Sequence, residues 1–283
     1  MLYYAKMEPV CYLNGAIVPL SEARLGVLDL ATLRGFGVYE GLTSFAGEPF
    51  HFSDHWDRFL SSAAALGLVV PATAHEVREA MRAVIAHNAP GTRANLRMVL
   101  TGGEALSGIE HMPGRESLFI TAEAATPLPA ALYERGGHLI SREHQRFMPE
   151  MKTIHYITAV MLQRERAAAQ AIEILYTANG HALECATSNV FIVKDGAVIT
   201  PDTGILKGIT RQVTLALARA TRPTEERAVP TSELLSADEA FITSSFKDIV
   251  PIVSIDEHRI SSGAPGPVTR DLMARFGQYT ETY

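Results

Sequence analysis

The lysine at position 152 is the residue best suited to covalent chemistry. The sequence has five lysines, which are Lys6, Lys152, Lys194, Lys207 and Lys247. Lys152 lies in the segment Pro149–Tyr156, just before an apolar helical pattern. Burial among apolar groups lowers the pKa of a lysine, and the neutral amine is the nucleophile that condenses with an aldehyde. A lysine that extends its stem along apolar surface at a strand end explains the same position without chemistry.

An acidic residue followed by small polar residues precedes a predicted strand. The segment Leu183–Asn189 contains Glu184, and the strand begins near Val190. A buried carboxylate needs a cationic or N–H partner, such as a protonated pyridine nitrogen. A turn whose hydroxyl and amide side chains cap the local backbone explains the same residues. Both interpretations stay open for this segment by itself.

Three further segments have the groups that bind an anion such as phosphate. Gly204–Gln212 opens a predicted helix, and Thr210 lies in its first turn, where backbone N–H groups point outward. Phe241–Ser245 ends a predicted strand in hydroxyl residues, and Arg58 adds a cation on one face of another helix. Ordinary helix capping, a polar strand end and an ion pair with a neighbouring aspartate are the structural alternatives.

The ordered set of Arg58, Lys152, Glu184, Thr210 and Ser245 is more informative than any of its members. It provides an amine for an aldehyde, a carboxylate for a ring nitrogen, and a cation, a helix start and a hydroxyl for a phosphate. These groups together would hold one phosphorylated pyridine aldehyde, pyridoxal 5′-phosphate. The set therefore predicts an enzyme that moves amino groups.

The chain resembles the class IV aminotransferases, which are the fold-type IV pyridoxal-phosphate enzymes. This family includes branched-chain aminotransferases, D-amino acid aminotransferases, (R)-selective amine transaminases and aminodeoxychorismate lyase. The resemblance extends from the Asn14-Gly15 turn to about Ile255. It is carried by Arg34–Glu40, His55–Phe59, Lys152–Tyr156, Glu184–Val193 with Asp195-Gly196, Leu206–Gln212 and Phe241–Ser245.

The resemblance implies a role for each matching residue. Lys152 is the Schiff-base lysine and the proton carrier, Glu184 pairs with the pyridine nitrogen, and Tyr156 hydrogen-bonds the phenolic oxygen. The other implied cofactor contacts are Arg58, Ile209, Thr210 and Ser245 at the phosphate, Leu206 on the ring, and Ser188 and Ser244 as neighbours. Tyr39 is expected to line the substrate pocket.

The residues that hold the α-carboxylate predict the substrate. Familiar D-amino acid aminotransferases have a threonine-arginine-glycine segment after the strand that matches Asn95–Leu100, whereas this chain has Thr101-Gly102-Gly103, and His111 follows only later. Arg97 and Arg34 together could form a carboxylate clamp instead. A surface turn for Arg34 and a structural ion pair for Arg97 are the alternatives.

This pattern resembles a subgroup of D-amino acid aminotransferases that lacks the usual arginine and histidine pair. We therefore predict transfer of the amino group of a D-amino acid to a 2-oxo acid, either 2-oxoglutarate or pyruvate. A branched-chain L-amino acid aminotransferase is the first alternative. An (R)-amine transaminase or an aminodeoxychorismate lyase follows.

Hairpins and helices must position these residues. The turns Asn14-Gly15, Ala46-Gly47 and Asp195-Gly196 join predicted strands at 10–13 and 16–18, 42–45 and 49–52, and 190–193 and 197–200. Further strands are predicted at Asn95–Leu100, Leu118–Ala122, Ile172–Thr177 and Ala240–Thr243. Helices are predicted from a cap at Ser53 or Asp54, and over His75–His87, Thr158–Ala171, Ile209–Ala220 and Val268–Phe276.

Strands outnumber helices and many are joined by hairpins, so the predicted class is α+β with mixed sheets. A boundary is expected in the proline-containing segment near Ala122–Leu132. The resemblance implies an N-terminal α/β sandwich-like domain over residues 1–122, an interdomain loop over 123–133 and a C-terminal pseudo-barrel domain over 134–283. It also implies a cofactor between the domains and a homodimer whose partner completes the substrate pocket.

Composition excludes several other classes. A formal net charge of −6 argues against a nucleic-acid partner. No apolar run reaches the roughly 20 residues that cross a bilayer, and Met1–Val10 is not typical of a signal peptide. Two cysteines are too few for a disulfide framework, so a cytoplasmic location is expected. His51 and His55 lack the neighbouring glutamate of a zinc-protease helix, and no metal is predicted.

Overall fold

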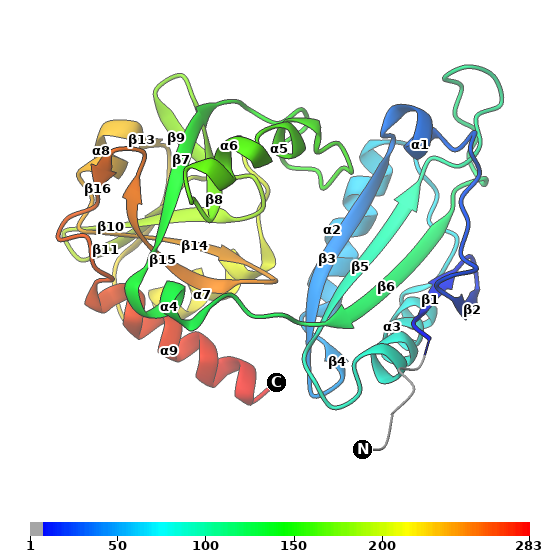
Figure 1. Ribbon diagram of the computed structural model, residues 1–283, viewed down its shortest axis with the longest axis horizontal. Helices are drawn as coiled ribbons and strands as arrows, with labels where there is room; N and C mark the ends of the chain where they lie inside the picture. Colours follow the sequence, from blue (N-terminus) through cyan, green and yellow to red (C-terminus); the bar gives the residue numbers. More distant parts are fainter. Residues whose placement is uncertain (1–7) are drawn as a thin grey trace. The chain divides into compact units, whose positions relative to one another are not determined.

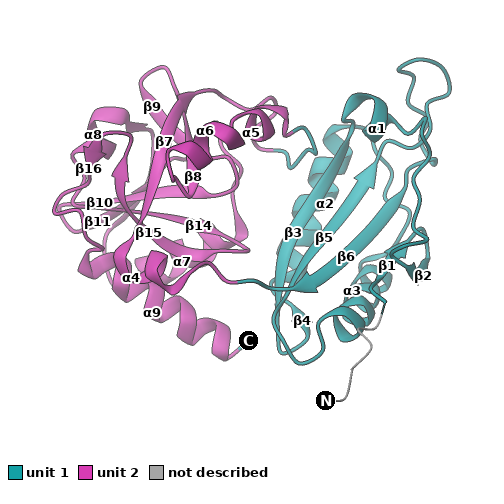
Figure 2. Cartoon of the chain, viewed as in Figure 1, with its two compact units in different colours: residues 1–126, 151–155, 283 teal, residues 127–150, 156–282 magenta. Residues whose placement is uncertain are grey.

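The computed structural model describes residues 8–283, which form two compact units (Figure 2). Unit 1 holds the described residues up to Thr126 together with Met151–His155 and Tyr283. Unit 2 holds Pro127–Glu150 and Tyr156–Thr282. Lys6 and most of the N-terminal segment considered above lie outside the described residues. The prediction of a single interdomain loop over 123–133 does not account for Met151–His155, which belong to unit 1 although they follow that loop in the sequence.

Unit 1 is built on an antiparallel sheet with the strand order β2-β1-β6-β5-β3-β4. Its strands are β1 (Val10–Leu13), β2 (Ala16–Pro19), β3 (Gly37–Phe45), β4 (Glu48–Pro49), β5 (Ala94–Thr101) and β6 (Leu118–Ala124). The helices α2 (Phe52–Ala65) and α3 (Ala74–Asn88) cover one face of this sheet, and the short α1 (Leu30–Arg34) precedes β3 (Figure 1).

Alternation along the strands places the core of unit 1 between the sheet and its two helices. Leu96, Met98 and Leu100 of β5 are buried, whereas Arg97 between them is exposed. Phe59 of α2 is fully buried against this side of the sheet. The opposite face of the sheet is therefore the face that can present polar side chains.

The start of α2 differs from the prediction. The helix begins at Phe52 with His51 as its N-cap, in a left-handed conformation (φ 48°) and with no side-chain cap bond. Ser53 and Asp54 lie inside the first turn, so the predicted cap there is wrong. The predicted strand at 49–52 is also wrong, because β4 ends at Pro49 and the helix starts three residues later. An acidic residue favours the N-terminal turn as well as the cap itself, which explains the error.

Unit 2 contains a mixed sheet that closes on itself. Its strands are β7 (Gly137–Glu143), β8 (Glu173–Ala178), β9 (His181–Cys185), β10 (Asn189–Lys194), β11 (Ala197–Thr200), β12 (Thr224–Glu226), β13 (Val229–Pro230), β14 (Glu239–Ser244), β15 (Asp248–Ile255) and β16 (His258–Arg259). The order is β12-β11-β10-β14-β15-β7-β8-β9-β13, and a further pairing of Glu184 with Asn189 joins β9 to β10. The ring β10-β14-β15-β7-β8-β9 is thereby closed, and parallel pairs lie on both sides of β7.

The helices of unit 2 are α4 (Ala130–Arg135), α5 (Ile157–Met161), α6 (Gln163–Ala168), α7 (Ile209–Arg219), α8 (Thr231–Leu235) and α9 (Pro267–Glu281). The helix predicted over Thr158–Ala171 is confirmed in part, because a one-residue turn at Leu162 (ψ −2°) divides it into α5 and α6, and α6 ends at Ala168. The side-chain amide of Gln163 donates to the carbonyl of Ala159 at 2.9 Å, a contact that residue type alone does not predict. Of the described helices, none is long and apolar enough to cross a bilayer.

The predicted hairpins are confirmed in their turns. Asn14-Gly15, Ala46-Gly47 and Asp195-Gly196 all have positive φ at both residues. Each turn joins the antiparallel pair expected of it. Two consecutive positive-φ residues match the right-handed twist of the flanking strands.

Candidate active site

Lys152 is fixed by the backbone of unit 1. Its carbonyl accepts a hydrogen bond from the Tyr39 amide at 2.9 Å, and Thr153 bridges Val38, so the segment extends the edge of β3. The Lys152 amide donates to Ser62 Oγ on α2 at 3.1 Å. The half-buried side chain then lies over the Tyr39 ring, with Nζ 4.4 Å from the ring centroid and 3.3 Å from the hydroxyl.

Tyr39, Lys152 and Arg97 lie on one face of the sheet. In the antiparallel register Tyr39 is opposite Val99, and Gly41 is opposite Arg97, so Arg97 is two residues along β5 from the row that holds Tyr39. Residues that face each other or are two apart in neighbouring strands share a face. Two predicted substrate residues and the predicted catalytic lysine are thus brought together within unit 1.

The predicted partners in the carboxylate clamp are not in contact with each other. Arg97 forms an ion pair with Glu123 at 3.0 Å, and its side chain is 49% exposed. The exposed Arg34 donates to the carbonyl of Leu33 at 2.8 Å. Arg34 precedes Gly37, the residue opposite Thr101, and therefore lies beyond that end of β3, whereas Arg97 is opposite Gly41 at the middle of the strand. A carboxylate bound by both arginines would have to reach from Arg97 to the far side of the Gly37 end of β3.

Arg58 is held by a buried carboxylate that the sequence did not single out. Its Nε and one terminal nitrogen bind the two oxygens of Glu40 at 2.8 and 2.7 Å. His55 Nδ1 is 2.7 Å from the same carboxylate, and both Glu40 and His55 are fully enclosed. The spacing of His55, Arg58 and Ser62 on α2 puts all three on the face that meets β3 and the Lys152 segment.

The charges of this cluster are set by burial and by Arg58. Burial raises the pKa of Glu40, but the charge and hydrogen bonds of Arg58 and then the hydrogen bond of His55 outweigh it and lower that pKa to about 2. Burial also lowers the pKa of His55, more than Glu40 raises it. Near neutral pH the cluster is therefore an ionised Glu40, a cationic Arg58 and a neutral His55.

Glu184 lies in unit 2 where the closed sheet is completed. It pairs with Asn189 across β9 and β10, and the Cys185 amide donates to the Ser188 carbonyl at 2.7 Å to form the turn between them. Arg146 Nε donates to Glu184 Oε1 at 2.8 Å, and the Leu206 amide donates to Oε2 at 3.0 Å. The Glu184 side chain is only 8% exposed, so the carboxylate is fixed at both oxygens.

Arg146 is a site residue that sequence reasoning missed. It lies in an irregular segment between β7 and Lys152, where neither periodicity nor a motif marks it. Its guanidinium binds Glu184 and the carbonyl of Pro149. The one signal in the sequence was the physical rule that a buried carboxylate needs a cation, which does not say which cation.

The predicted phosphate residues of unit 2 are present as a helix start and a hydroxyl-rich strand end. Helix α7 begins at Ile209 after Gly208, and no side chain caps its first amides. Asn189 fixes the approach to the helix, because its Nδ2 donates to the Leu206 carbonyl at 2.7 Å and its Oδ1 accepts from the Gly208 amide at 3.2 Å. A Cβ at Gly208 would lie 2.3 Å from that oxygen, so only glycine fits there.

Other predicted residues have partners inside unit 2 or sit at its helix starts. Ser188 donates to Glu173 at 3.0 Å, which turns its hydroxyl toward that carboxylate. Tyr156 is half-buried at the N-cap of α5. Leu206 is nearly buried.

His51 and His55 of unit 1 bind Asp54 and Glu40 respectively, and residues 8–283 contain no cluster of side chains suited to a metal ion.

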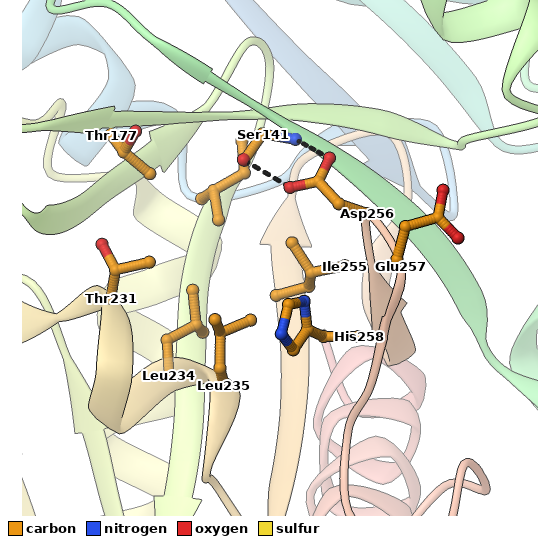
Figure 3. Close-up of a pocket in the computed structure, with 10 residues that line it drawn as sticks. Ser141, Thr177, Thr231, Leu234, Leu235, Ile255, Asp256, Glu257 and His258 are labelled. Carbon is orange, nitrogen blue, oxygen red and sulfur yellow. Dashed lines mark hydrogen bonds between the residues drawn. The ribbon is translucent and has the colours of Figure 1, made fainter.

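Two cavities in the described part of the chain are lined by residues other than the predicted ones. A pocket of about 190 Å³ in unit 2 is lined by Leu234, Leu235 and Ile255, among other residues (Figure 3). Asp256, which also lines it, accepts hydrogen bonds from the amide and hydroxyl of Ser141, at 2.8 and 2.5 Å. A cavity of about 600 Å³ in unit 1 lies by the Ala46-Gly47 turn and the end of α3.

Comparison with known proteins identifies the family. The sequence model of the amino-transferase class IV family matches residues 37–255. This chain belongs to the class IV aminotransferases. It is 30% identical over 270 residues to a D-alanine aminotransferase of Listeria monocytogenes, with 93% of each chain covered.

Solved structures share the whole fold. The chain is similar to the branched-chain amino acid aminotransferase of Thermobaculum terrenum in its PLP-form, with a TM-score of 0.86, 26% identity, and coverage of 98% of this chain and 95% of the other. It is also similar to the Escherichia coli branched-chain amino acid aminotransferase, with a TM-score of 0.87, 26% identity, and coverage of 97% and 95%. The predicted two-domain fold-type IV architecture with its barrel-like sheet is confirmed.

Class IV aminotransferases use pyridoxal 5′-phosphate, and the residues of unit 2 fit that group. The hydroxyls of Thr243 and Ser244 are buried and have no hydrogen-bond partner among the described residues. They end β14, and a buried hydroxyl without a partner is unfavourable unless a ligand supplies one. Because these consecutive residues of β14 point to opposite faces of the sheet, a phosphate supplies an acceptor for one of the two hydroxyls, and Glu184 is an acceptor for a protonated ring nitrogen.

Proposed function

We propose that this aminotransferase acts on D-amino acids and a 2-oxo acid, 2-oxoglutarate or pyruvate. The observation that carries the proposal is the shared sheet face of Lys152, Tyr39 and Arg97, because it puts a cation on the same face as the proposed catalytic amine. A guanidinium binds a carboxylate in a bidentate manner, which favours amino acids over simple amines. The D-alanine aminotransferase relatives support the D configuration.

We propose that each unit contributes a set of cofactor residues. The set in unit 1 is Arg58 and Lys152, and the set in unit 2 is Tyr156, Glu184, Ser188, Leu206, Ile209, Thr210, Ser244 and Ser245. When bound, the cofactor supplies an aldehyde that exchanges the amino group and a ring that takes up electrons. Glu184, fixed by Arg146 and the Leu206 amide, keeps the ring nitrogen protonated.

Lys152 is proposed to move the proton of the reaction. Once the substrate amine has displaced it from the cofactor, the neutral Nζ would take the proton from the α-carbon of the substrate, hold it and donate it back later in the reaction. The Tyr39 ring and hydroxyl hold Nζ on the sheet face where we place the substrate. Arg97, with Arg34 as the second cation, orients the carboxylate so that the α-proton faces this amine.

Borohydride reduction tests the proposed lysine. The reduced holoenzyme is digested, and mass spectrometry locates the phosphopyridoxyl group, which we expect on Lys152. The Lys152→Arg variant should give no adduct, whereas Lys194→Arg, at the end of β10, should match the wild type. An adduct on a different lysine, or none in cofactor-saturated protein, contradicts the assignment.

The second candidate is a branched-chain L-amino acid aminotransferase. The whole-chain similarity to the branched-chain enzymes, with TM-scores of 0.86 and 0.87, favours it. A panel of D-alanine, D-glutamate, L-leucine, L-valine and (R)-1-phenylethylamine distinguishes the candidates. Turnover of the D-amino acids above the L-amino acids supports the first proposal, and the reverse order supports the second.

We also propose that the chain forms a homodimer. The five-residue helix α5 exposes Ile157, Val160 and Met161 by 63%, 69% and 75%, and Phe147, which precedes it in the same unit, is 76% exposed. Large apolar side chains gathered on one element of a unit are typical of a contact with another chain. A monomeric mass in sedimentation or light scattering would contradict the proposal.

A cytoplasmic location is proposed from the cysteines. Cys11 and Cys185 are both free and buried, and burial raises the pKa of each thiol. Such thiols are structural and persist in a reducing compartment. Cell fractionation with antibody detection would test this location.

A further inference from the structure

We propose that Lys247 is a positioning residue for the cofactor phosphate, acting through Glu173 to lock the strand end that carries Ser244 and Ser245. This inference rests on the proposed cofactor site and adds a residue that no sequence motif assigned. Lys247 lies in the turn between β14 and β15, and Thr187 and Ser188 lie in the turn between β9 and β10, both in unit 2.

The ammonium of Lys247 is surrounded by three oxygens from the neighbouring turn and strand. Nζ is 2.7 Å from Glu173 Oε1, 2.6 Å from Thr187 Oγ1 and 3.3 Å from Ser188 Oγ. An ammonium group has three N–H donors, so the set matches its full capacity. Thr187 and Ser188 also donate to the same Glu173 oxygen, which makes one compact network.

The backbone of Lys247 is held as well. Its amide donates to the Ser244 carbonyl at 3.3 Å, and its own carbonyl accepts from the Tyr133 hydroxyl at 3.1 Å. Ser244 is opposite Asp248 in the hairpin register, so the loop contains only Ser245, Phe246 and Lys247. A side chain anchored at the third loop residue therefore restrains the position of the two serines.

The network connects the two sides of the proposed cofactor site in unit 2. Thr187 and Ser188 follow Glu184 closely in the β9–β10 turn, and Ser244 and Ser245 precede Lys247. The buried hydroxyls of Thr243 and Ser244, which have no partner among the described residues, end the strand that this lysine secures. Preorganised donors of this kind bind a phosphate without the entropy cost of ordering a flexible loop.

The buried carboxylate of Glu173 has Lys247 as its counter-charge. Its side chain is only 5% exposed at the start of β8, and that of Lys247 is 19% exposed. Burial raises the pKa of Glu173, but the charge and hydrogen bond of Lys247 and then the two hydroxyls outweigh it and lower that pKa. Removing Lys247 leaves a buried carboxylate without its cation, which is strongly unfavourable.

The test compares pyridoxal 5′-phosphate with pyridoxal, which lacks the phosphate. For Lys247→Met we expect the Kd of pyridoxal 5′-phosphate to rise about tenfold, on the order of one hydrogen bond to a charged group, while the Kd of pyridoxal changes little. Lys194→Met is the matched control, because that lysine is at another hairpin turn of unit 2 and pairs with Asp238. It should keep both affinities.

A second variant separates positioning from simple stability. Lys247→Met with Glu173→Gln removes both charges and restores a neutral interior, so we expect the free energy of unfolding to recover while the selective loss of phosphate affinity persists. Equal losses for both ligands, or a wild-type ratio in the double variant, would overturn the inference. If the wild-type protein itself binds no pyridoxal 5′-phosphate, the proposed function fails instead.

Discussion

Each of the two units buries a carboxylate against an arginine. In unit 1 the arginine is the proposed cofactor contact, whereas in unit 2 the carboxylate is. In unit 1 the fully enclosed Glu40 holds Arg58, which is the residue proposed to meet the phosphate. In unit 2 Arg146 holds Glu184, which is the residue proposed to meet the ring nitrogen. One pair fixes a positive charge and the other a negative charge. The same ion-pair chemistry can therefore position a charge of either sign.

The support given to the carboxylate also differs between the pairs. Glu40 is held by two side chains of α2, whereas Glu184 is held by one side chain and by the Leu206 amide. A backbone donor remains in place when a side chain is changed. The site in unit 2 should therefore tolerate loss of its positioning residue better than the site in unit 1.

The largest effect is expected from Glu184→Gln. Glutamine keeps the shape but loses the negative charge that stabilises a protonated ring nitrogen, so kcat should fall on the order of 10²–10³-fold, as for loss of one preorganised electrostatic contact. Steady-state transamination measures the effect. Glu225→Gln, at an exposed residue of the same unit, is the control. A kcat within a factor of about two of the wild type would remove Glu184 from the mechanism.

Glu40→Gln should chiefly affect stability and phosphate affinity. Breaking a buried ion pair by removing one charge costs about 3–5 kcal/mol. Urea unfolding of the apoenzyme gives this free energy, and cofactor titration should show weaker binding of pyridoxal 5′-phosphate because Arg58 loses its orientation. Glu48→Gln is the matched control, since its pair with Arg82 is 42% exposed at Glu48. Unchanged cofactor affinity in a destabilised Glu40 variant would make the cluster structural alone.

The pH dependence of stability should follow Glu40. Its pKa falls from 4.5 to about 2 on folding, so its contribution is present above pH 4.5 and is lost as the pH drops toward 2. The contribution is on the order of 3 kcal/mol. The free energy of unfolding of the wild type should therefore decline more steeply than that of Glu40→Gln across this range. Parallel curves would show that another group governs the acid transition.

The smallest effect is expected at the exposed pair of Arg97 and Glu123. Glu123→Gln should change the free energy of unfolding by less than about 1 kcal/mol, as is usual for surface ion pairs. If Arg97 binds the substrate carboxylate, losing its competitor should lower KM about twofold, whereas Arg97→Ala should raise it. If both variants have the same KM as the wild type, the substrate carboxylate binds elsewhere and not at Arg97.

Local sequence predicted much of this protein. The three hairpin turns follow from residues that accept positive φ, and α7 and α9 follow from apolar periodicity. It missed the turn at Leu162 that divides one predicted helix into two, and it placed a helix cap at Ser53 or Asp54, where an acidic residue fits the first turn as well as the cap. These choices depend on contacts that residue type does not encode.

The sequence by itself determined which groups are available: the lysine at 152, the carboxylate at 184, the glycine at 208 and the hydroxyls that end β14. Only the tertiary structure decided which groups hold the site residues in place. Glu40 binds Arg58, Arg146 binds Glu184 and Lys247 binds Glu173, and the partners in each pair are far apart in the sequence. A buried charge must have a partner, but the sequence does not say which distant residue the fold brings to it.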